Sequence, residues 1–538
     1  MINYKNIITA VCLALSSTAM AQKEHSFEVA KNLDIFNTLY RELDMLYVDT
    51  LDAKKVIEVG IDAMLSNLDP YTEFYAEEDM RDLKIMTTGK YGGIGSIIRL
   101  RKDSTIIIGE PYEGMPASLV GLKVGDVITK VDGKVITKEM KTGDVSDMLR
   151  GEPGTTFVLQ VKRPGEKKTR EFSITRQNIK LPALVYSGIY KDMGYINLTQ
   201  FTENCSKDVR KAVISLKEKG AKGIVLDLRN NGGGLLSEAV DIVNLFVPKG
   251  LKIVETKGKV KNANSTYSTK YEPLDLDIPL AVLVNGNTAS AAEIVSGSLQ
   301  DLDRATIIGS KTFGKGLVQS PRDLPYNTSI KLTTSKYYIP SGRCIQAIDY
   351  KKRREGEKDT TADSLKHIFH TSKGRVVKDG GGIMPDIEVK HDTLPNLIFY
   401  VSNDDVLIDW GTKYAQAHAT IPAVKDFTIT ESDFEEFKTM LKASNFKYDR
   451  MSEKRLEDLK KMAKFEGYYD DAKPEFEALE AKLQHNLDRD LDIHKKNIMK
   501  VMAQEIIKRY YFQAGCVEES LKDDEDLEKA VETINNEE

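Results

Sequence analysis

The sequence predicts a multidomain α/β protein, in which a β-rich module precedes an α/β core and helical segments flank both. Three changes along the 538 residues lead to this prediction. Apolar residues recur at helical spacing from 27 to about 85, short β-rich runs separated by glycines fill about 86–176, and apolar strands alternate with helices from about 180 to 392. A chain of this length exceeds one hydrophobic core, so we expect three or four domains.

The first 21 residues are typical of a secretory signal peptide. Lys5 gives a basic start, an apolar run covers 7–15, and the letters AMA at 19–21 precede Gln22 as a cleavage site would. The apolar run is too short to span a bilayer. We therefore expect export, with the periplasm as first candidate compartment and membrane association left open. A buried N-terminal helix is the alternative.

The remaining chain divides into four regions that differ in their pattern of apolar residues and glycines. A helical arm is expected over 22–85, a β-rich module over 86–176, an α/β core over 177–395 and a helical domain over 396–538. In the core, buried strands are expected at Gly223–Leu228, Leu280–Val284 and Thr306–Ile308, with helices at 236–246 and 289–302 between them. Strands joined by helices imply parallel pairing. Long helices are expected at 453–465 and 474–511, in a domain for docking or dimerisation that lacks any catalytic motif.

Composition excludes several classes of protein. The 77 basic and 82 acidic residues nearly balance, which does not suggest nucleic acid as a partner. After the signal peptide only Cys205, Cys344 and Cys516 remain, too few and too scattered for a disulfide framework. Only seven histidines in a chain of this length do not indicate a metal site, and no cofactor is expected.

The segment 285–293 reads NGNTASAAE and follows a buried strand. Ser290 would then stand at the start of a small-residue helix, where free helix amides favour developing negative charge. A structural alternative carries equal weight from this segment alone, because Ser290 and Glu293 also fit a capping box. Further along, the segment 311–319 reads KTFGKGLVQ and sets Lys315 between two glycines. A lysine can act as a base near neutral pH only when desolvation lowers its pKa from about 10.4.

These segments resemble the C-terminal processing (tail-specific) serine peptidases, over about residues 30–392. The resemblance implies a ClpP/crotonase-like α/β protease core, with Ser290 as nucleophile, Lys315 as general base and Gln319 as a third member of the site. Along a straight strand, Gln319 would lie about 13 Å from Lys315, so its role depends on a bend at the glycines. The motifs YIPSGRCIQ at 338–346, with Cys344 where serine is common, and GIMPD at 382–386 also match the family.

Two further sets of residues follow from the resemblance. The stretch DLRNNGGG at 227–234 implies an oxyanion hole made by the amides of Gly234 or Gly233 and of Ala291. Asp301 occupies the position, eleven residues after the serine, of a carboxylate found in some members, and its role stays open.

The β-rich module resembles a PDZ domain inserted in this family. A loop of four residues would bind a substrate's C-terminal carboxylate: Gly92, Gly93, Ile94 and Gly95. The strand after it, at 96–100, could pair with an extended peptide, and the run PASLVGLKVGDVI at 116–128 strengthens the resemblance.

The expected function is that of an exported serine endopeptidase acting on proteins with apolar C-terminal tails, without metal or cofactor. An adaptor protein and a homodimer are partners that the sequence leaves open. Two rival functions are a non-catalytic scaffold with a relic core and a crotonase-like acyl-CoA enzyme. An export signal and a PDZ module disfavour the acyl-CoA enzyme.

Overall fold

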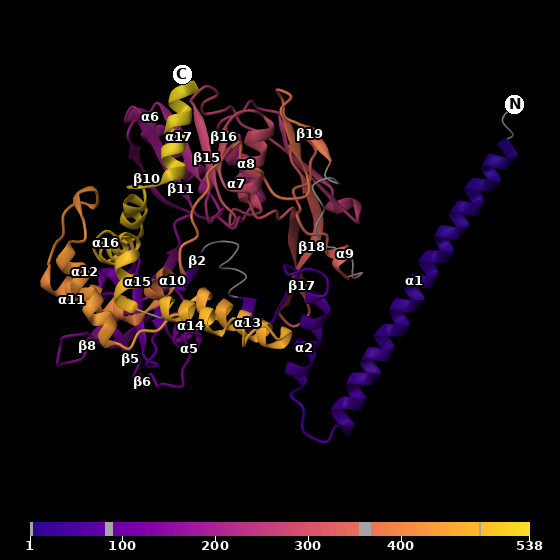
Figure 1. Ribbon diagram of the computed structural model, residues 1–538. Coiled ribbons are helices and arrows are strands. Elements are labelled where there is room, and N and C mark those ends of the chain that lie inside the picture. Colours follow the sequence, from indigo (N-terminus) through magenta and orange to yellow (C-terminus); the bar gives the residue numbers. More distant parts are fainter. Residues whose placement is uncertain (1–3, 81–89, 355–366, 484–485, 538) are drawn as a thin grey trace. The chain divides into compact units, whose positions relative to one another are not determined.

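The computed structural model describes residues 4–80, 90–354, 367–483 and 486–537 (Figure 1), with side chains from His25 onward. The predicted signal peptide, residues 1–21, therefore lies outside the described side chains. The chain divides into two compact units, Met1–Phe74 with Pro321–Leu332, and Tyr75–Ser320 with Thr333–Glu538. All the predicted catalytic residues belong to the second unit.

The smaller unit is mainly helical, in line with the apolar periodicity. It contains α1 (Tyr4–Leu46), α2 (Ala53–Ser66) and most of a short strand that the sequence did not predict, β1 (Glu73–Tyr75). Asp52 caps α2, because its side chain accepts the amide hydrogen of Lys55 at 3.1 Å. Within the described residues, no helix is both long enough and apolar enough to cross a membrane.

The β-rich module forms a sheet in which the strand order is β3-β4-β5-β7-β8, with β6 on β5. Its inner face buries Ile106, Ile108, Leu159 and Val145 in one apolar cluster. A two-stranded pair, β2 with β9, joins the ends of the module. The elements in chain order are η1 (Glu77–Asp79), β2 (Lys90–Gly93), β3 (Ser96–Leu100), β4 (Ile106–Pro111), α4 (Pro116–Leu119), β5 (Val127–Val131), β6 (Lys134–Val135), α5 (Thr142–Leu149), β7 (Thr156–Lys162), β8 (Arg170–Thr175) and β9 (Gln177–Lys180).

A six-stranded sheet of order β10-β11-β12-β15-β16-β21 forms the core, and its last five strands run parallel. The side chains alternate: Ile224 and Leu226 of β12 face the helices α6 to α8, while Val225 faces the other side. The predicted α/β class is thus confirmed. The elements are β10 (Leu184–Tyr190), β11 (Met193–Leu198), α6 (Cys205–Glu218), β12 (Gly223–Asp227), α7 (Leu236–Val243), β15 (Leu280–Val284), α8 (Ala291–Asp301), β16 (Thr306–Gly309) and β21 (Ile387–Glu388).

A second sheet lies beside this core within the larger unit. Its strand β13 pairs with β14 on one side and with residues 335–338 of β18 on the other. The remaining elements of this region are β13 (Lys252–Gly258), η2 (Lys261–Ala263), β14 (Ser265–Ser268), β17 (Leu317–Leu324), β18 (Thr328–Tyr338), α9 (Tyr350–Arg354), β19 (Ile368–His370) and β20 (Val376–Lys378).

The C-terminal region is helical, but the single helix predicted over 474–511 is wrong. The structure breaks it into three helices, because Asn486 caps α15 by accepting the amide hydrogen of Arg489 at 3.0 Å and that helix ends at Ile493. Trp410 is fully buried at the centre of this region. The helices are α10 (Asn396–Asn403), α11 (Asp405–Ala417), η4 (Val424–Asp426), α12 (Glu431–Ala443), α13 (Met451–Glu466), α14 (Lys473–Lys482), α15 (Leu487–Ile493), α16 (Lys495–Ser520) and α17 (Glu525–Glu537).

The last helix, α17, packs on the protease core. Its buried residues Leu527, Val531 and Ile534 join one apolar cluster with Val225 and Leu283 of the central sheet, and Figure 1 shows α17 beside the core strands. The sequence had placed this helix in a separate domain. It instead covers the face of the sheet that α6 to α8 leave open.

Candidate active site

Three segments of the site follow three adjacent parallel strands. The loop that contains Gly233 follows β12, the turn that contains Ser290 follows β15, and the loop that contains Lys315 follows β16. These strands are neighbours in the order β12-β15-β16. Because the carboxyl ends of parallel strands meet at one edge of a sheet, the topology brings the three segments together.

Ser290 has a strained backbone. Its φ of 58° and ψ of −117° lie in a region that residues with a side chain rarely occupy. The turn before it is held in place, since the Thr288 hydroxyl donates to the carbonyl of Leu228 at 2.9 Å and the Ala289 amide donates to the carbonyl of Asn231 at 2.9 Å. A strained residue between a strand and a helix exposes its side chain at the top of the sheet, as nucleophilic serines require.

The capping-box arrangement of Ser290 and Glu293 is present, but no hydrogen bond to the Ser290 side chain caps the helix. The Glu293 carboxylate accepts the amide hydrogen of Ser290 at 2.9 Å. The Glu293 amide, in turn, donates to the Ser290 carbonyl rather than to its hydroxyl. In the part of the chain that the structure describes, no hydrogen bond is recorded for Ser290 Oγ. The helix start is therefore capped by Glu293 while the hydroxyl stays available.

Glu293 also holds the lysine loop. Its Oε2 accepts the amide hydrogen of Lys315 at 2.9 Å, and its Oε1 accepts those of Gly314 at 2.8 Å and the Thr312 hydroxyl at 2.5 Å. The side chain is fully buried. Burial raises the pKa of Glu293 to about 7, against the lowering effect of these hydrogen bonds. One carboxylate thus joins the backbones of Ser290 and Lys315.

Tyr337 makes a second bridge between the same two residues. Its hydroxyl lies 2.7 Å from the carbonyl oxygen of Lys315 and 3.1 Å from that of Ser290. Complete burial raises the pKa of Tyr337 well above its ordinary value, so the hydroxyl remains a neutral donor. Glu293 fixes the two amides and Tyr337 the two carbonyls, which together set the relative position of Ser290 and Lys315.

Close packing explains the glycine before Lys315. Gly314 has a φ of +88°, and a Cβ added there would lie 2.6 Å from the Cβ of Ala347. Only glycine satisfies both conditions. Lys315 itself is half-buried.

Gln319 lies on β17, where its Nε2 donates to the hydroxyl of Thr333 on β18 at 3.1 Å. The recorded partner of its side chain is therefore a neighbouring strand. Gln319 lies within β17, so a bend that turns it toward Lys315 would have to lie before Leu317, where this strand begins.

The two glycines predicted for the oxyanion hole, Gly233 and Gly234, differ in whether an acceptor is recorded for the backbone amide. A Cβ on Gly233, whose φ is +102°, would lie 2.8 Å from the Cβ of Ser290, so this glycine contacts the nucleophile directly. Its amide is already used, because it donates to Asn231 Oδ1 at 2.9 Å. Across the described residues no acceptor is recorded for the amides of Gly234 and Ala291, two of the predicted oxyanion donors.

Asp301 has a structural partner away from this edge. It pairs with Arg343 at 2.8 Å and accepts the Ser341 amide hydrogen at 3.0 Å, and both charged side chains are almost fully buried. Asp301 ends α8 whereas Ser290 precedes its first residue. Eleven helical residues span about 16 Å, so the carboxylate stands at the far end of the helix from the nucleophile.

The predicted peptide-binding loop leads from β2 into β3, the edge strand of the PDZ sheet. The carbonyl of Ile94 accepts from Ala117 at 2.8 Å and that of Gly95 accepts from Tyr112 at 2.9 Å, whereas Gly92 and Gly93 pair with β9. Among the described residues, no acceptor is recorded for the amides of Ile94 and Gly95. These two amides remain for a carboxylate.

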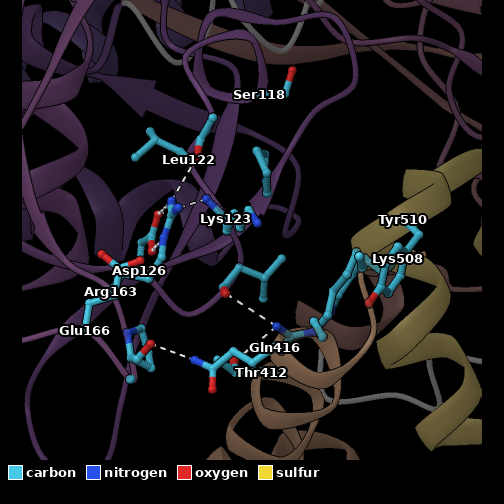
Figure 2. Close-up of a pocket in the computed structure, with 18 of the residues that line it drawn as sticks. Ser118, Leu122, Lys123, Asp126, Arg163, Glu166, Thr412, Gln416, Lys508 and Tyr510 are labelled. Carbon is cyan, nitrogen blue, oxygen red and sulfur yellow. Dashed lines mark hydrogen bonds and ion pairs between the residues drawn. The ribbon is translucent and has the colours of Figure 1, made fainter. Parts of the chain in front are cut away.

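A cavity lies away from these residues. A space of about 750 Å³ lies between the PDZ module and the helical region, and Figure 2 shows Gln416 donating across it to the PDZ side. That bond, to the Pro164 carbonyl, measures 2.6 Å. None of the predicted catalytic residues lines this cavity.

Sequence reasoning missed Tyr337 and Arg229. Tyr337 directly precedes the motif at 338–346, and Arg229 lies inside the stretch 227–234. A position in or next to a motif was therefore the available signal, although neither residue type suggested its contacts.

Comparisons with known proteins agree with this arrangement. Residues 192–352 match the family described as Peptidase family S41, residues 107–163 match a PDZ domain, and residues 397–534 match the helical domain described as "Probable PDZ-protease, C-terminal helical domain". The fold and these matches define a serine-type peptidase with a PDZ module.

Relatives narrow the class. A carboxy-terminal-processing protease of Bartonella bacilliformis is 37% identical over 348 residues, covering 63% of this chain and 79% of that protein. A probable CtpA-like serine protease of Staphylococcus aureus is 35% identical over 366 residues, covering 67% and 71%. The solved structure of the photosystem II D1 C-terminal processing protease is 28% identical in sequence. The match covers 67% of this chain and 93% of that protein, with a TM-score of 0.35. The chain belongs to peptidase family S41, among the carboxy-terminal-processing proteases.

Proposed function

We propose that this chain is an exported endopeptidase that cleaves proteins near their C-termini, with Ser290 as nucleophile and Lys315 as general base. The observation that carries the proposal is the double bridge, in which Glu293 joins the amides and Tyr337 the carbonyls of these two residues. Such positioning is what a serine and its base need in order to exchange a proton repeatedly.

The chemistry uses only side chains and backbone. Neutral Lys315 takes the proton from Ser290 Oγ as that oxygen attacks the scissile carbonyl carbon. The amides of Gly234 and Ala291 hold the oxyanion. The Lys315 ammonium then protonates the leaving amine, which leaves an acyl-enzyme on Ser290. Water attacks this ester, Lys315 accepts its proton, and Ser290 is restored as the peptide acid leaves.

Tail recognition would fall to the PDZ module. β3 is an edge strand and α5 packs beside it, so an extended peptide can add to the sheet between them. The free amides of Ile94 and Gly95 would receive the terminal carboxylate. An apolar tail fits this role, and an adaptor protein or a second copy of the chain would be additional partners in delivering it.

The dyad is tested by three single variants. Ser290→Ala and Lys315→Ala should each abolish cleavage of an unstructured test protein, while Lys311→Ala, an exposed lysine four residues earlier, should retain it. All three should bind a tail peptide alike. Persistent cleavage by Ser290→Ala would remove the serine assignment, and a wild-type chain that binds tails without cutting would favour the scaffold.

Export and substrate class need measurements in cells. Fractionation should place the mature protein, starting near Gln22, outside the cytoplasm. A mass-spectrometric survey of protein C-termini should find exported proteins with longer tails in cells that carry Ser290→Ala. Longer tails confined to cytoplasmic proteins would contradict export.

A further inference from the structure

The C-terminal helix reaches the candidate active site through one arginine. The segment before α17 presents Asp524, whose Oδ1 accepts the Leu527 amide hydrogen at 3.1 Å and so caps the helix. The same carboxylate binds the guanidinium of Arg229, with Oδ1 at 2.9 Å from Nη1 and Oδ2 at 2.6 Å from Nη2. Asp526 adds a third contact, at 2.9 Å from Nη1.

Arg229 also binds the end of the central strand β12. Its backbone amide donates to Asp227 Oδ1 at 2.8 Å, and its Nη2 lies 2.7 Å from Asp227 Oδ2. The hydroxyl of Tyr195 donates to the same Oδ2 at 2.6 Å. The guanidinium is therefore held on one side by the sheet and on the other by the start of α17.

The loop that begins at Arg229 ends at the oxyanion amides. Asn230 donates its amide hydrogen to Asn285 Oδ1 at 3.0 Å, and Asn231 donates through its side chain to the Leu198 carbonyl at 2.8 Å. Gly233 then contacts Ser290. Arg229 thus fixes the first residue of a six-residue loop, 229–234, whose last residue supplies an oxyanion donor.

Charge indicates how Arg229 acts. Three carboxylates surround this one cation, and the side chains of Asp227 and Asp526 are each only 4% exposed. Because the carboxylates outnumber the cation, the cluster offers no net positive field to an oxyanion, so the contribution of Arg229 is geometric. Removing one carboxylate from a buried, hydrogen-bonded group of this kind is costly, because it disturbs every remaining contact.

We propose that Asp524 and Asp526 brace the oxyanion loop through Arg229, which makes α17 a working part of the peptidase although it lies outside residues 192–352. Arg229, Asp524 and Asp526 are positioning residues. The inference rests on the proposed function, since a brace matters only if the loop of Gly234 stabilises an oxyanion formed at Ser290.

The test compares Asp524→Asn with Asp523→Asn in the full chain. Asparagine is as good a helix cap as aspartate, so Asp524→Asn keeps the helix cap. It removes the negative charge that position 524 presents to Arg229. The neighbouring Asp523 pairs with Lys496 and Lys500, and supplies the control. Asp524→Asn should lower kcat for a tail-bearing peptide about tenfold or more with KM unchanged. Asp523→Asn should match the wild type.

A peptide boronate separates a lost brace from a general loss of stability. Its tetrahedral adduct on Ser290 places an oxygen in the oxyanion position, so its inhibition constant should rise with Asp524→Asn in step with the fall in kcat/KM, well below the unfolding temperature. Equal kcat and boronate affinity in the two variants would overturn the brace. If Asp524→Asn does not fold, Asp526→Asn, which leaves the cap intact, is measured in the same way. Activity that survives Ser290→Ala refutes the proposed function instead.

Discussion

The hydroxyl of Tyr337 lies 2.7 Å from the carbonyl oxygen of Lys315, in a position where it also reaches the carbonyl of Ser290. Two loops that follow neighbouring strands thereby share one buried donor. The Glu293 carboxylate likewise joins the two loops, because it accepts the amide hydrogens of both Ser290 and Lys315. The relative position of Ser290 and Lys315 is thus set through their backbones.

Tyr337→Phe should lower kcat/KM about tenfold, because losing one hydrogen bond of about 1 kcal/mol loosens the two loops relative to each other. The ring still fills its space, so the protein should fold. Tyr338→Phe is the control, since the Tyr338 ring instead contacts the Lys257 ammonium, 4.7 Å from its centroid. The measurement is kcat/KM for peptide hydrolysis by the two variants. Equal values would show that the hydrogen bonds of the Tyr337 hydroxyl are dispensable for activity.

Gly233→Ala should reduce activity at least about a hundredfold, because displacing a nucleophile by about 1 Å can cost that much. The added Cβ would lie 2.8 Å from the Cβ of Ser290 and would need a φ of +102°. The backbone strain alone costs about 1–3 kcal/mol. Gly232→Ala is the matched control, since a Cβ there meets nothing within 4 Å.

Steady-state kinetics and urea unfolding of both glycine variants should be measured together. A hundredfold loss in Gly233→Ala with near-wild-type Gly232→Ala would support direct contact between the loop and Ser290. Comparable activities would contradict it.

Much of the fold could be predicted because it depends on short-range patterns. Buried runs such as Leu280–Val284 mark strands, and alternation with helices implies parallel order. The site followed from a motif resemblance plus topology, since carboxyl ends of adjacent parallel strands share an edge. The capping box could be predicted for the same local reason, because Glu293 lies one helical turn from Ser290. Its second role, toward Lys315, is a tertiary contact.

Long-range contacts could not be predicted. Nothing in the pattern around Tyr337 shows that its hydroxyl points at two carbonyls, and Asp524 lies 295 residues from Arg229. The sequence placed 525–537 within a helical domain, and nothing in its pattern indicated that α17 packs on the central sheet. The prediction of one helix over 474–511 was wrong because local capping residues, rather than average composition, determine where a helix begins and ends.

The stability of the chain should depend on the ionisation of Glu293. Burial raises the pKa of Glu293 from 4.5 to about 7. Between these values the folded state keeps a proton that the unfolded state has released, so stability falls as pH rises. Relative to Glu293→Gln, which does not titrate, the wild type should lose up to about 3 kcal/mol of unfolding free energy over this range.

Urea unfolding of wild type and Glu293→Gln at several pH values between 4.5 and 7.5 measures this difference. A difference that stays flat or grows with pH would mean that the four donors around the carboxylate outweigh its burial. Glu293 would then be ionised throughout the range.

Asp301→Asn should destabilise the protein without slowing the folded enzyme. Arg343 would keep its charge in a buried position with a weakened partner, at a cost of about 3–5 kcal/mol. The carboxylate stands at the opposite end of α8 from Ser290, so the rate per active site should not change. Active-site titration with a fluorophosphonate gives that rate, and urea unfolding gives the stability.

A double variant separates an ion pair from a catalytic role. Replacing both partners by apolar residues, Asp301→Leu with Arg343→Met, removes the unpaired charge and should recover most of the stability lost in Asp301→Asn. It should also keep the wild-type rate per active site. A variant that is stable but slow in this series would instead assign Asp301 to the reaction, because the loss could no longer be attributed to an unpaired buried charge on Arg343.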